Sequence, residues 1–410
     1  MDGMNRRGFV LSLGGAVAAR PDWPQWAGPT RNFVVPAVKL ATSWPEGGPK
    51  RLWTRDLGEG YSGIAESGGV LYTMYRRGVE DVVVAIAAAT GKTIWEYAYA
   101  APKLGGQDFN PGPGPHAMPL LAGDRLFAAG ATGIFHCLEK KTGRKIWAHS
   151  LIEGWGGSPV MFGYSCNPMP YKDTVIMLVG GRNHSLVAFR QSDGTAAWQA
   201  QNFANSNSSP VLIQVDGQDQ IVAFMTSQVI GVDPNAGGAL LWTHKHTTQY
   251  GLAVSMPVWG PDNLLFFSSS YEGGSRCLKL TRDGPKTEVD ELWHNNRVRI
   301  HFGSIIRVGD VIYGSSGHSG PCFFTALDVK TGKILWQDRT FAKATFLMIG
   351  DRFLILDEDG TLALATPAAE GLTIHCQASI LVKNAWTIPT LVGTKIYVRD
   401  RKVMMALELS

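Results

Sequence analysis

The stretches TGKTIW (90–95), TGRKIW (142–147) and TGKILW (331–336) are nearly the same six residues, and all three occur in one chain of 410 residues. Two looser copies end at Trp198 and Trp242. A catalytic loop usually occurs once in a chain, so a sequence motif that recurs indicates a repeated structural unit.

The spacing of the marker tryptophans gives the length of that unit. From Trp53 to Trp336 the successive steps are 42, 52, 51, 44, 51 and 43 residues. This period is longer than a leucine-rich or ankyrin-type repeat, and it suits a propeller blade of four strands.

One unit, residues 116–147, shows the pattern of such a blade. Its apolar runs are short and are divided by Gly-Asp and Thr-Gly pairs, which are turn signals because glycine adopts a positive φ at little steric cost. We expect strands at 118–121, 125–129, 134–138 and 145–147, and little helix after the first twenty residues. The Thr-Gly pair then closes the last hairpin, and the tryptophan on the outer strand fills the space between adjacent blades.

Counting these units predicts the whole ring. Six units end at a tryptophan, and residues 346–378 form a seventh that lacks one. Residues 385–409 supply three strands of an eighth, and residues 51–57 supply its missing outer strand. The prediction is an all-β fold, a single eight-bladed β-propeller of four-stranded antiparallel blades, closed by an N-terminal strand that completes the last blade. Seven blades is the alternative if residues 343–380 do not form a full blade.

The N-terminal residues resemble a twin-arginine export signal. MNRRGFVLSLGGAVAA (4–19) contains two adjacent arginines, a short apolar run and an Ala-x-Ala pattern. The run is too short to span a bilayer, and no cysteine follows it to carry a lipid anchor. We expect a signal segment at 1–20, an N-terminal lead-in at 21–50 and the propeller at 51–410, in a periplasmic or secreted protein. A disordered tail is the alternative for 1–20.

Charge and cysteine content argue against several classes of protein. The net charge of +4 is scattered along the chain, which argues against nucleic acid as the partner. The five cysteines form no adjacent pair and no Cys-x-x-Cys motif, so they give no zinc, haem or redox signal. We expect a monomer without a transmembrane span.

The cysteines are best interpreted as core residues. Cys137 and Cys277 fall on a third-strand position that small residues hold in other units. Those residues are Ala85, Ala188, Val232 and Ala326. A disulfide between Cys166 and Cys322 is left open.

The best copy of the repeat, TALDVKTGKILW (325–336), resembles the pyrroloquinoline-quinone (PQQ) repeat family of β-propellers. The segment PDWPQWAGPTRN (21–32) resembles the start of exported bacterial members, and the resemblance covers residues 22–409. The family includes quinone-dependent alcohol and sugar dehydrogenases and the outer-membrane assembly lipoprotein BamB. The resemblance therefore implies the fold strongly and the function weakly.

The resemblance also implies what a dehydrogenase of this family would need. Such members hold calcium with Glu, Asn and Asp, use an Asp base, often carry an adjacent cysteine pair and place the quinone on a Trp. This chain has no adjacent cysteines and few acidic residues where the inner strands begin. It is also much shorter than those enzymes, and its size is closer to that of BamB.

Propeller ligands usually lie where the inter-blade loops converge on the axis. The repeat places ten polar or aromatic side chains there as ligand-binding candidates, none of them assigned as catalytic or as a metal ligand. They are Tyr61, Asp108, Asn110, His116, Trp155, Asn207, Tyr250, His301, Lys343 and Trp386. Such a set suits a peptide, a sugar or a flat cofactor, and the alternative is an ordinary polar rim without a ligand.

Three further stretches carry more local hypotheses. The loop GQDFNPGPGPH (106–116) is either a lid over the funnel or a stiff surface loop. HKH (244–246) is expected on an exposed outer strand, with a metal site as the alternative. EVDE (288–291) is expected at a solvated hairpin tip.

Together these observations favour an exported, non-catalytic binding or scaffold propeller for a protein or carbohydrate ligand, without a cofactor. The alternative is a PQQ- and calcium-dependent alcohol or sugar dehydrogenase. Its base would be Asp108 with His116 or His301. A hydrolase or lyase on the same rim is a third alternative, because fold does not settle function.

Overall fold

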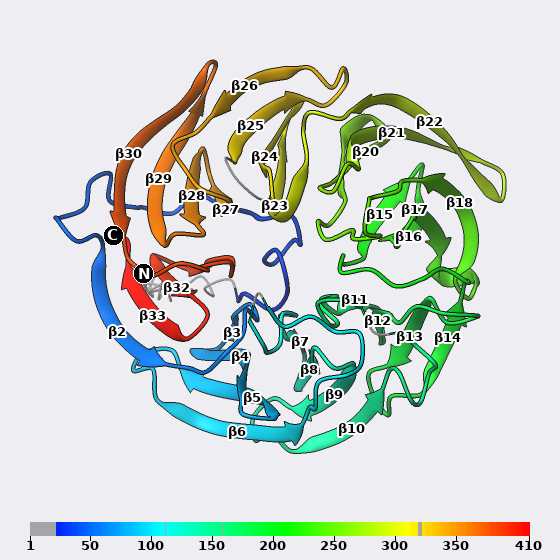
Figure 1. The fold of residues 1–410 in the computed structure, drawn as a ribbon, viewed down its shortest axis with the longest axis horizontal. Coiled ribbons are helices and arrows are strands. Elements are labelled where there is room, and N and C mark those ends of the chain that lie inside the picture. Colours follow the sequence, from blue (N-terminus) through cyan, green and yellow to red (C-terminus); the bar gives the residue numbers. More distant parts are fainter. Residues whose placement is uncertain (1–21, 111, 159, 319–321) are drawn as a thin grey trace, which may run out of the picture.

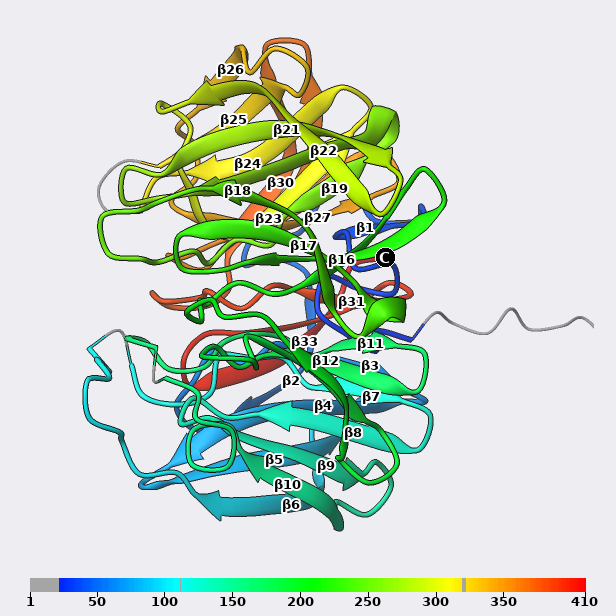
Figure 2. The ribbon, with the colours of Figure 1, turned by 90° about the vertical axis from the view of Figure 1, so that its right-hand side faces the viewer.

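The computed structural model describes residues 22–110, 112–158, 160–318 and 322–410, so the expected signal at 1–20 lies outside the described residues. It confirms the all-β propeller of eight four-stranded antiparallel blades, which follow one another around a central axis (Figure 1). Seen from its edge, the ring is a thick disc whose strands run from one face to the other (Figure 2).

Blades 1 to 4 each use four consecutive strands. Blade 1 consists of β3 (Ala65–Ser67), β4 (Val70–Arg77), β5 (Glu80–Ala87) and β6 (Thr93–Ala100). Blade 2 consists of β7 (Leu120–Ala122), β8 (Arg125–Ala129), β9 (Ile134–Glu139) and β10 (Lys145–Ser150). Blade 3 consists of β11 (Met169–Tyr171), β12 (Thr174–Leu178), β13 (Leu186–Arg190) and β14 (Ala196–Ala200). Blade 4 consists of β15 (Val211–Val215), β16 (Gln218–Phe224), β17 (Gln228–Asp233) and β18 (Ala239–Lys245).

Blades 5 to 7 follow the same pattern. Blade 5 consists of β19 (Val258–Gly260), β20 (Leu264–Ser269), β21 (Gly274–Asp283) and β22 (Lys286–Asn295). Blade 6 consists of β23 (Ile300–Val308), β24 (Val311–Ser316), β25 (Phe323–Asp328) and β26 (Ile334–Asp338). Blade 7 consists of β27 (Ala344–Ile349), β28 (Arg352–Asp357), β29 (Thr361–Ala368) and β30 (Gly371–Ser379). Two short 3-10 turns, η1 (Pro234–Ala236) and η2 (Pro261–Asn263), are the only helical elements of the described residues, and no helix there is long and apolar enough to cross a membrane.

Blade 8 closes the ring as the sequence predicted. The chain supplies β31 (Thr390–Val392), β32 (Lys395–Arg399) and β33 (Val403–Glu408), and β2 (Lys50–Asp56) pairs antiparallel with β33 as the outer strand. The buried guanidinium of Arg399 donates to the carbonyl oxygens of Gly60, at 2.8 Å, and Met74, at 2.9 Å. Residues from the two ends of the chain are therefore tied together at the closure.

The segment before β2 lies across the axis of the ring, where its blue trace reaches the centre in Figure 1. Trp23 exchanges two backbone hydrogen bonds of 2.9 Å with Glu66 of blade 1, and β1 (Val34–Val35) pairs in parallel with β27 of blade 7. The buried Arg31 donates to the carbonyl oxygens of Asn167 and Pro210, ahead of blades 3 and 4. The lead-in thus connects several blades through the middle of the ring.

The Thr-Gly-Trp repeat is a contact between neighbouring blades. Trp147 of blade 2 donates its Nε1–H to the carbonyl oxygen of Gln191 at 3.3 Å, and its ring packs on Gly194 in the turn of blade 3. A Cβ on Gly194 would lie 2.7 Å from that ring, and the glycine φ is +76°. Trp53 makes the same contacts with Ala88 and Gly91 across the ring closure. The turn glycine is therefore required both by backbone conformation and by the indole of the preceding blade.

A β-bulge in the outer strand sets the position of each of these tryptophans opposite the third strand of its blade. The register between β9 and β10 skips Ile146, so that Trp147 lies directly opposite Cys137. The same skip exposes Ile94 in blade 1, which is 50% exposed beside Trp95. Plain strand alternation did not predict this shift, because a bulge adds a residue to one strand only.

The small third-strand residues are confirmed as buried core residues at one position of the blade, with one correction. Ala85, Cys137, Ala188, Cys277 and Ala326 each lie opposite a tryptophan. In blade 4 the opposite residue is Gly231, and the assignment of Val232 to this position was wrong by one residue because the turn of blade 4, which contains η1, is one residue longer. All five cysteines are free thiols.

Candidate functional site

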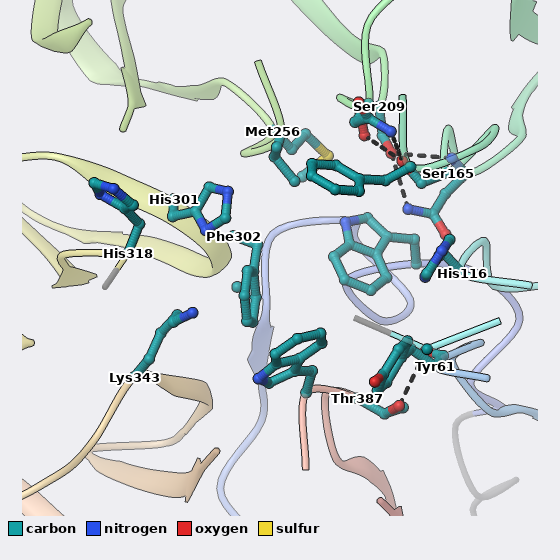
Figure 3. A pocket seen from close by; sticks show the side chains of 18 of the residues that line it. Tyr61, His116, Ser165, Ser209, Met256, His301, Phe302, His318, Lys343 and Thr387 are labelled. Carbon is teal, nitrogen blue, oxygen red and sulfur yellow. Dashed lines mark hydrogen bonds between the residues drawn. The ribbon is translucent and has the colours of Figure 1, made fainter. Parts of the chain in front are cut away.

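A cavity of about 370 Å³ lies on the axis, where the inter-blade loops converge. Its wall takes residues from loops and strand starts of most blades (Figure 3). Trp26 of the lead-in also lines it. Its volume falls within the range of small-molecule sites, about 300–1,000 Å³.

An arc of aromatic rings forms one wall. The ring of Tyr61 stacks on His116 at 5.6 Å between centroids and lies 4.7 Å from Trp386. Phe302 continues the arc at 5.4 Å from Trp386, and His301 follows at 5.3 Å from Phe302. Stacked and edge-to-face contacts of this kind hold the rings in fixed orientations, so the wall is preorganised.

The arc extends to the rim through blade 5. Tyr271 packs edge-on to His301 at 5.0 Å and contacts His318 at 4.7 Å. Tyr250 lies 5.3 Å from Tyr271 and is 55% exposed. The cavity therefore opens past tyrosine and histidine rings towards solvent.

Lys343 is the buried cation of the cavity wall. Its Nζ lies 4.6 Å from the centre of the Phe302 ring and 5.4 Å from that of Trp386. Glu358 approaches the same Nζ at 3.6 Å and accepts the Nε1–H of Trp386 at 2.9 Å. Glu358 thus balances the lysine charge and fixes the indole in one orientation.

Amides and hydroxyls form the opposite wall. Asn167 accepts the backbone N–H of Met118 at 2.6 Å and donates to Ser209 at 2.9 Å. Asn207 donates to the carbonyl oxygen of Gly163 at 2.9 Å and to Ser165 at 3.0 Å. Most of these groups hold adjacent inter-blade loops together.

The histidines of the wall are neutral at physiological pH. Burial lowers the pKa of His116 to about 4. Burial, followed by the charges of Lys343 and His318, lowers the pKa of His301 to about 3. Burial also raises the pKa of Tyr61. The cavity therefore presents polar but uncharged rings beside one compensated lysine and the carboxyl group of Asp108.

The loop at 106–116 lies against the mouth of the cavity. The backbone N–H of Asp108 donates to the carbonyl oxygen of Met161 at 2.6 Å, and the carboxylate accepts the N–H of Asn110 at 2.8 Å. Gly114, at φ +113°, packs so closely that a Cβ would lie 2.5 Å from the carbonyl oxygen of Glu59. Asp108, Gly112 and His116 of this loop line the cavity.

The structure brings seven of the ten predicted residues together around the cavity. They are Tyr61, Asp108, His116, Asn207, His301, Lys343 and Trp386. Asn110 is exposed on the loop, Tyr250 lies at the rim, and Trp155 packs edge-on to His149 and Phe189, away from the wall.

Sequence reasoning missed several members of the wall. They are Trp26, Asn167, Met256, Tyr271, Phe302 and His318. Trp26 falls in the lead-in, which has no repeat to place it, and Tyr271 and His318 come from loops between the second and third strands. Phe302 lies beside the predicted His301 and was within reach of the same argument.

HKH (244–246) and EVDE (288–291) were wrongly placed. His246 is 1% exposed and contacts Ser269 at 2.6 Å and Arg276 at 2.8 Å, because the strand end turns inward between blades. His244 contacts Glu291 at 2.9 Å. The acidic residues lie within β22 rather than at its tip, because the insertion lengthens both strands of that hairpin.

The sequence of this chain matches a known protein family. The family model described as outer membrane protein assembly factor BamB matches residues 79–338, more than half of the chain. The chain belongs to this family. It is 26% identical to BamB of Escherichia coli (strain K12) over 307 residues, which cover 69% of this chain and 71% of that protein. It is 23% identical to BamB of Yersinia pestis over 297 residues, covering 70% and 72%.

A solved structure outside the BamB branch has the same architecture. The chain resembles the quinohemoprotein alcohol dehydrogenase of Comamonas testosteroni with a TM-score of 0.64 and 12% identity. The match covers 96% of this chain and 81% of the dehydrogenase. At this identity the likeness shows the fold alone.

The cavity does not offer the ligands of a calcium site. Asp108 is its one carboxylate among the lining residues, and the Asn167 amide is committed to structural hydrogen bonds. Calcium prefers six or more oxygen ligands. No group of three or more His, Cys, Asp or Glu side chains within the described ranges is arranged to hold a metal ion. The donors present therefore differ from a calcium cage.

Proposed function

We propose that this member of the BamB family is an exported, non-catalytic binding or scaffold protein of the cell envelope, and that its axial cavity is the site for a protein or carbohydrate ligand. The observation that carries the proposal is the fixed aromatic arc of Tyr61, Trp386 and Phe302 around a cavity of about 370 Å³. Sites that bind small molecules are typically lined by aromatic and apolar side chains with a few placed polar groups.

The donor set supports binding over oxidation. A quinone dehydrogenase of this fold needs a metal cage and a base beside the substrate, and the cavity offers Asp108 with neutral imidazoles. Glu358 is already engaged by Lys343 and Trp386.

The envelope assignment rests on two further observations. The N-terminal sequence has the pattern of a twin-arginine export signal. The curated relatives are called outer membrane protein assembly factors. Both support a periplasmic or secreted protein that acts on partners in the envelope.

The test is a titration of the folded protein with ligands of three classes. They are PQQ with calcium, unfolded segments of outer-membrane proteins, and saccharides. Binding is monitored by tryptophan fluorescence and by Tm. A ligand at 100 times its Kd adds about 2.7 kcal/mol to the free energy of unfolding. We expect no response to PQQ with calcium and a saturable response to a peptide or a saccharide.

Two variants locate the response. Trp386→Ala removes the centre of the arc and should abolish it, and Trp155→Ala is the control because that ring lies away from the wall. A calcium-dependent response to PQQ, accompanied by dye-linked alcohol oxidation, would overturn the proposal in favour of the dehydrogenase.

A further inference from the structure

The ammonium of Lys343 faces the space of the axial cavity. Among the described residues that line the cavity, Lys343 is the only lysine or arginine, and Asp108, the only carboxylate, comes from the loop before blade 2. Figure 3 shows the lysine side chain directed towards Phe302 and the interior of the cavity. Its Nζ lies 4.6 Å from the centre of that ring. A ligand in the cavity therefore meets this ammonium.

The hydrogen-bonding capacity of the ammonium is left for a ligand. An ammonium carries three donors. Glu358 approaches Nζ at 3.6 Å, which is beyond hydrogen-bond distance, and the same carboxylate oxygen accepts the Nε1–H of Trp386 at 2.9 Å. The other contacts of Nζ with described residues are the ring faces of Phe302 and Trp386. Glu358 thus offsets part of the lysine charge without binding its donors.

The charge of Lys343 also acts on the histidines at the same end of the cavity. Burial, followed by the charges of Lys343 and His318, lowers the pKa of His301 to about 3. Burial, followed by the charges of Lys343 and Arg299, lowers the pKa of His318. At both imidazoles the positive charges outweigh that of Glu358. This end of the cavity, at blades 6 and 7, therefore has a positive potential that favours an anionic group.

The rest of the wall favours a peptide over a saccharide as the carrier of that group. The amide donors of Asn167 and Asn207 are already bonded to neighbouring loops. Several of the remaining lining side chains are apolar or aromatic, namely Trp26, Phe162, Val254, Met256 and Phe302. The hydroxyls of a saccharide need many polar partners, whereas an apolar side chain needs only such a surface.

We propose that the axial cavity takes an acidic peptide segment, in which the carboxylate of an aspartate or glutamate pairs with Lys343 and a neighbouring apolar side chain packs on the Tyr61–Trp386–Phe302 arc. This inference rests on the proposed binding function and names the chemistry of its ligand. The segment enters past Tyr271, where the cavity opens towards solvent.

The test is a library of hexapeptides with acetylated and amidated ends, selected on the full chain, with each selected peptide measured by calorimetry. The capped ends leave side chains as the only source of charge. We expect the selected peptides to carry an aspartate or glutamate beside an apolar residue. Replacement of that acidic residue by asparagine or glutamine should raise Kd about tenfold or more, because a charge-assisted hydrogen bond is lost.

Lys343→Met locates the recognition. It keeps a long side chain and removes the charge, so it should abolish the difference in Kd between an acidic peptide and its amide counterpart. Lys103→Met is the matched control, because the Lys103 ammonium also lies over a ring, 5.5 Å from the centre of Phe109, but does not line the cavity. The control should retain the difference. A difference that persists in Lys343→Met, or is lost in Lys103→Met, would overturn the assignment.

Glu358→Gln tests the electrostatics in the opposite direction. Glutamine keeps an oxygen that accepts the Trp386 N–H and removes the negative charge that competes for Lys343. The variant should therefore lower the Kd of an acidic peptide, whereas damage to the wall would raise it. Thermal unfolding shows that each variant is folded. An unchanged or raised Kd in a folded Glu358→Gln protein would contradict the proposal.

Other outcomes separate this inference from the proposed function. If only neutral peptides or neutral saccharides bind, and Trp386→Ala abolishes the binding, the binding function stands and the acidic peptide is rejected. The peptide is also rejected if an acidic saccharide, for which oligogalacturonate is the probe, binds in a Lys343-dependent manner and no peptide does. If no ligand of any class binds, or PQQ with calcium turns over alcohol, both fail.

Discussion

At the residue scale, the repeated motif with Thr-Gly and Trp connects one blade to the next. The indole of one blade occupies the space where a Cβ of the next turn would lie, and its N–H satisfies a carbonyl oxygen there. Trp293 repeats the contact with Gly332 and Val329. Trp242 is an exception that bonds to Gln220 of its own blade, since the lengthened β21–β22 hairpin carries the turn of blade 5 away.

Trp147→Ala should lower the free energy of unfolding by about 3–5 kcal/mol, because it leaves a cavity between two blades and an unpaired carbonyl oxygen. Urea unfolding measures the loss. Ile94→Ala, at a bulged and half-exposed position, is the control and should change stability by less than about 0.5 kcal/mol. A loss below about 1 kcal/mol for Trp147→Ala would show that the indole is not an inter-blade contact.

Gly194→Ala should destabilise the protein, because its Cβ would lie 2.7 Å from the Trp147 ring at a backbone φ of +76°. When the ring is absent, the backbone cost of about 1 kcal/mol and the close contact of the Cβ with His149 Nε2, at 2.8 Å, should remain. The double variant with Trp147→Ala should therefore be more stable than the sum of the single effects predicts. Additive losses would mean that the two residues do not touch.

At the scale of the element, β2 and the lead-in make an open row of blades into a closed, filled ring. β2 pairs with β33 over residues 50–56, and the contacts of Trp53 and Arg399 fasten blade 8 to blade 1. An unclosed propeller exposes a strand edge that invites aggregation.

Removal of residues 1–57 should therefore abolish cooperative folding and lead to aggregation, whereas removal of residues 1–20 should not. Light scattering and thermal unfolding compare the two truncations. A soluble, cooperatively unfolding fragment of residues 58–410 would show that strand exchange between the termini is dispensable.

At the scale of the whole molecule, stability depends on histidines buried between the blades and at the axis. Burial lowers the pKa of His116 to about 4 and the pKa values of His136, His246 and His301 to about 3. The unfolded chain takes up these protons near pH 6.5 and the folded chain only well below it, so stability is lost as the pH falls. Asp81 works in the opposite direction, because burial raises its pKa to about 6.

Burial also raises the pKa of Asp357. Because the four histidines outnumber Asp81 and Asp357, Tm should fall steadily between pH 6.5 and about pH 4. His136→Phe should flatten part of this fall, because His136 is 2% exposed among Tyr97 and Tyr99 and its Nδ1 has no partner among the described residues. His375→Phe, at an exposed histidine, is the control. A Tm that stays constant over this range would contradict the burial of these imidazoles.

The candidate site was predictable where the repeat supplied a register. His301 lies at the start of β23 and Lys343 directly before β27, and both reach the cavity. Trp155 stands at such a position too, but hydrogen bonds from Gly154 to Ser150 and from Gly156 to Ile152 coil its loop against blade 3. Loop conformation depends on such local bonds, which spacing alone does not reveal.

The sequence by itself determined the four-stranded pattern of each blade, the number of blades and the closure by β2. The signals for these features are turn glycines, apolar runs of strand length and regularly spaced tryptophans, which are local and recur in successive blades. Only the tertiary structure decided how the centre is filled. Trp26 and Arg31 belong to a segment without a repeat, and their contacts join residues more than one hundred positions apart. Such contacts arise from the closed ring as a whole, since the axis exists only after all eight blades have met.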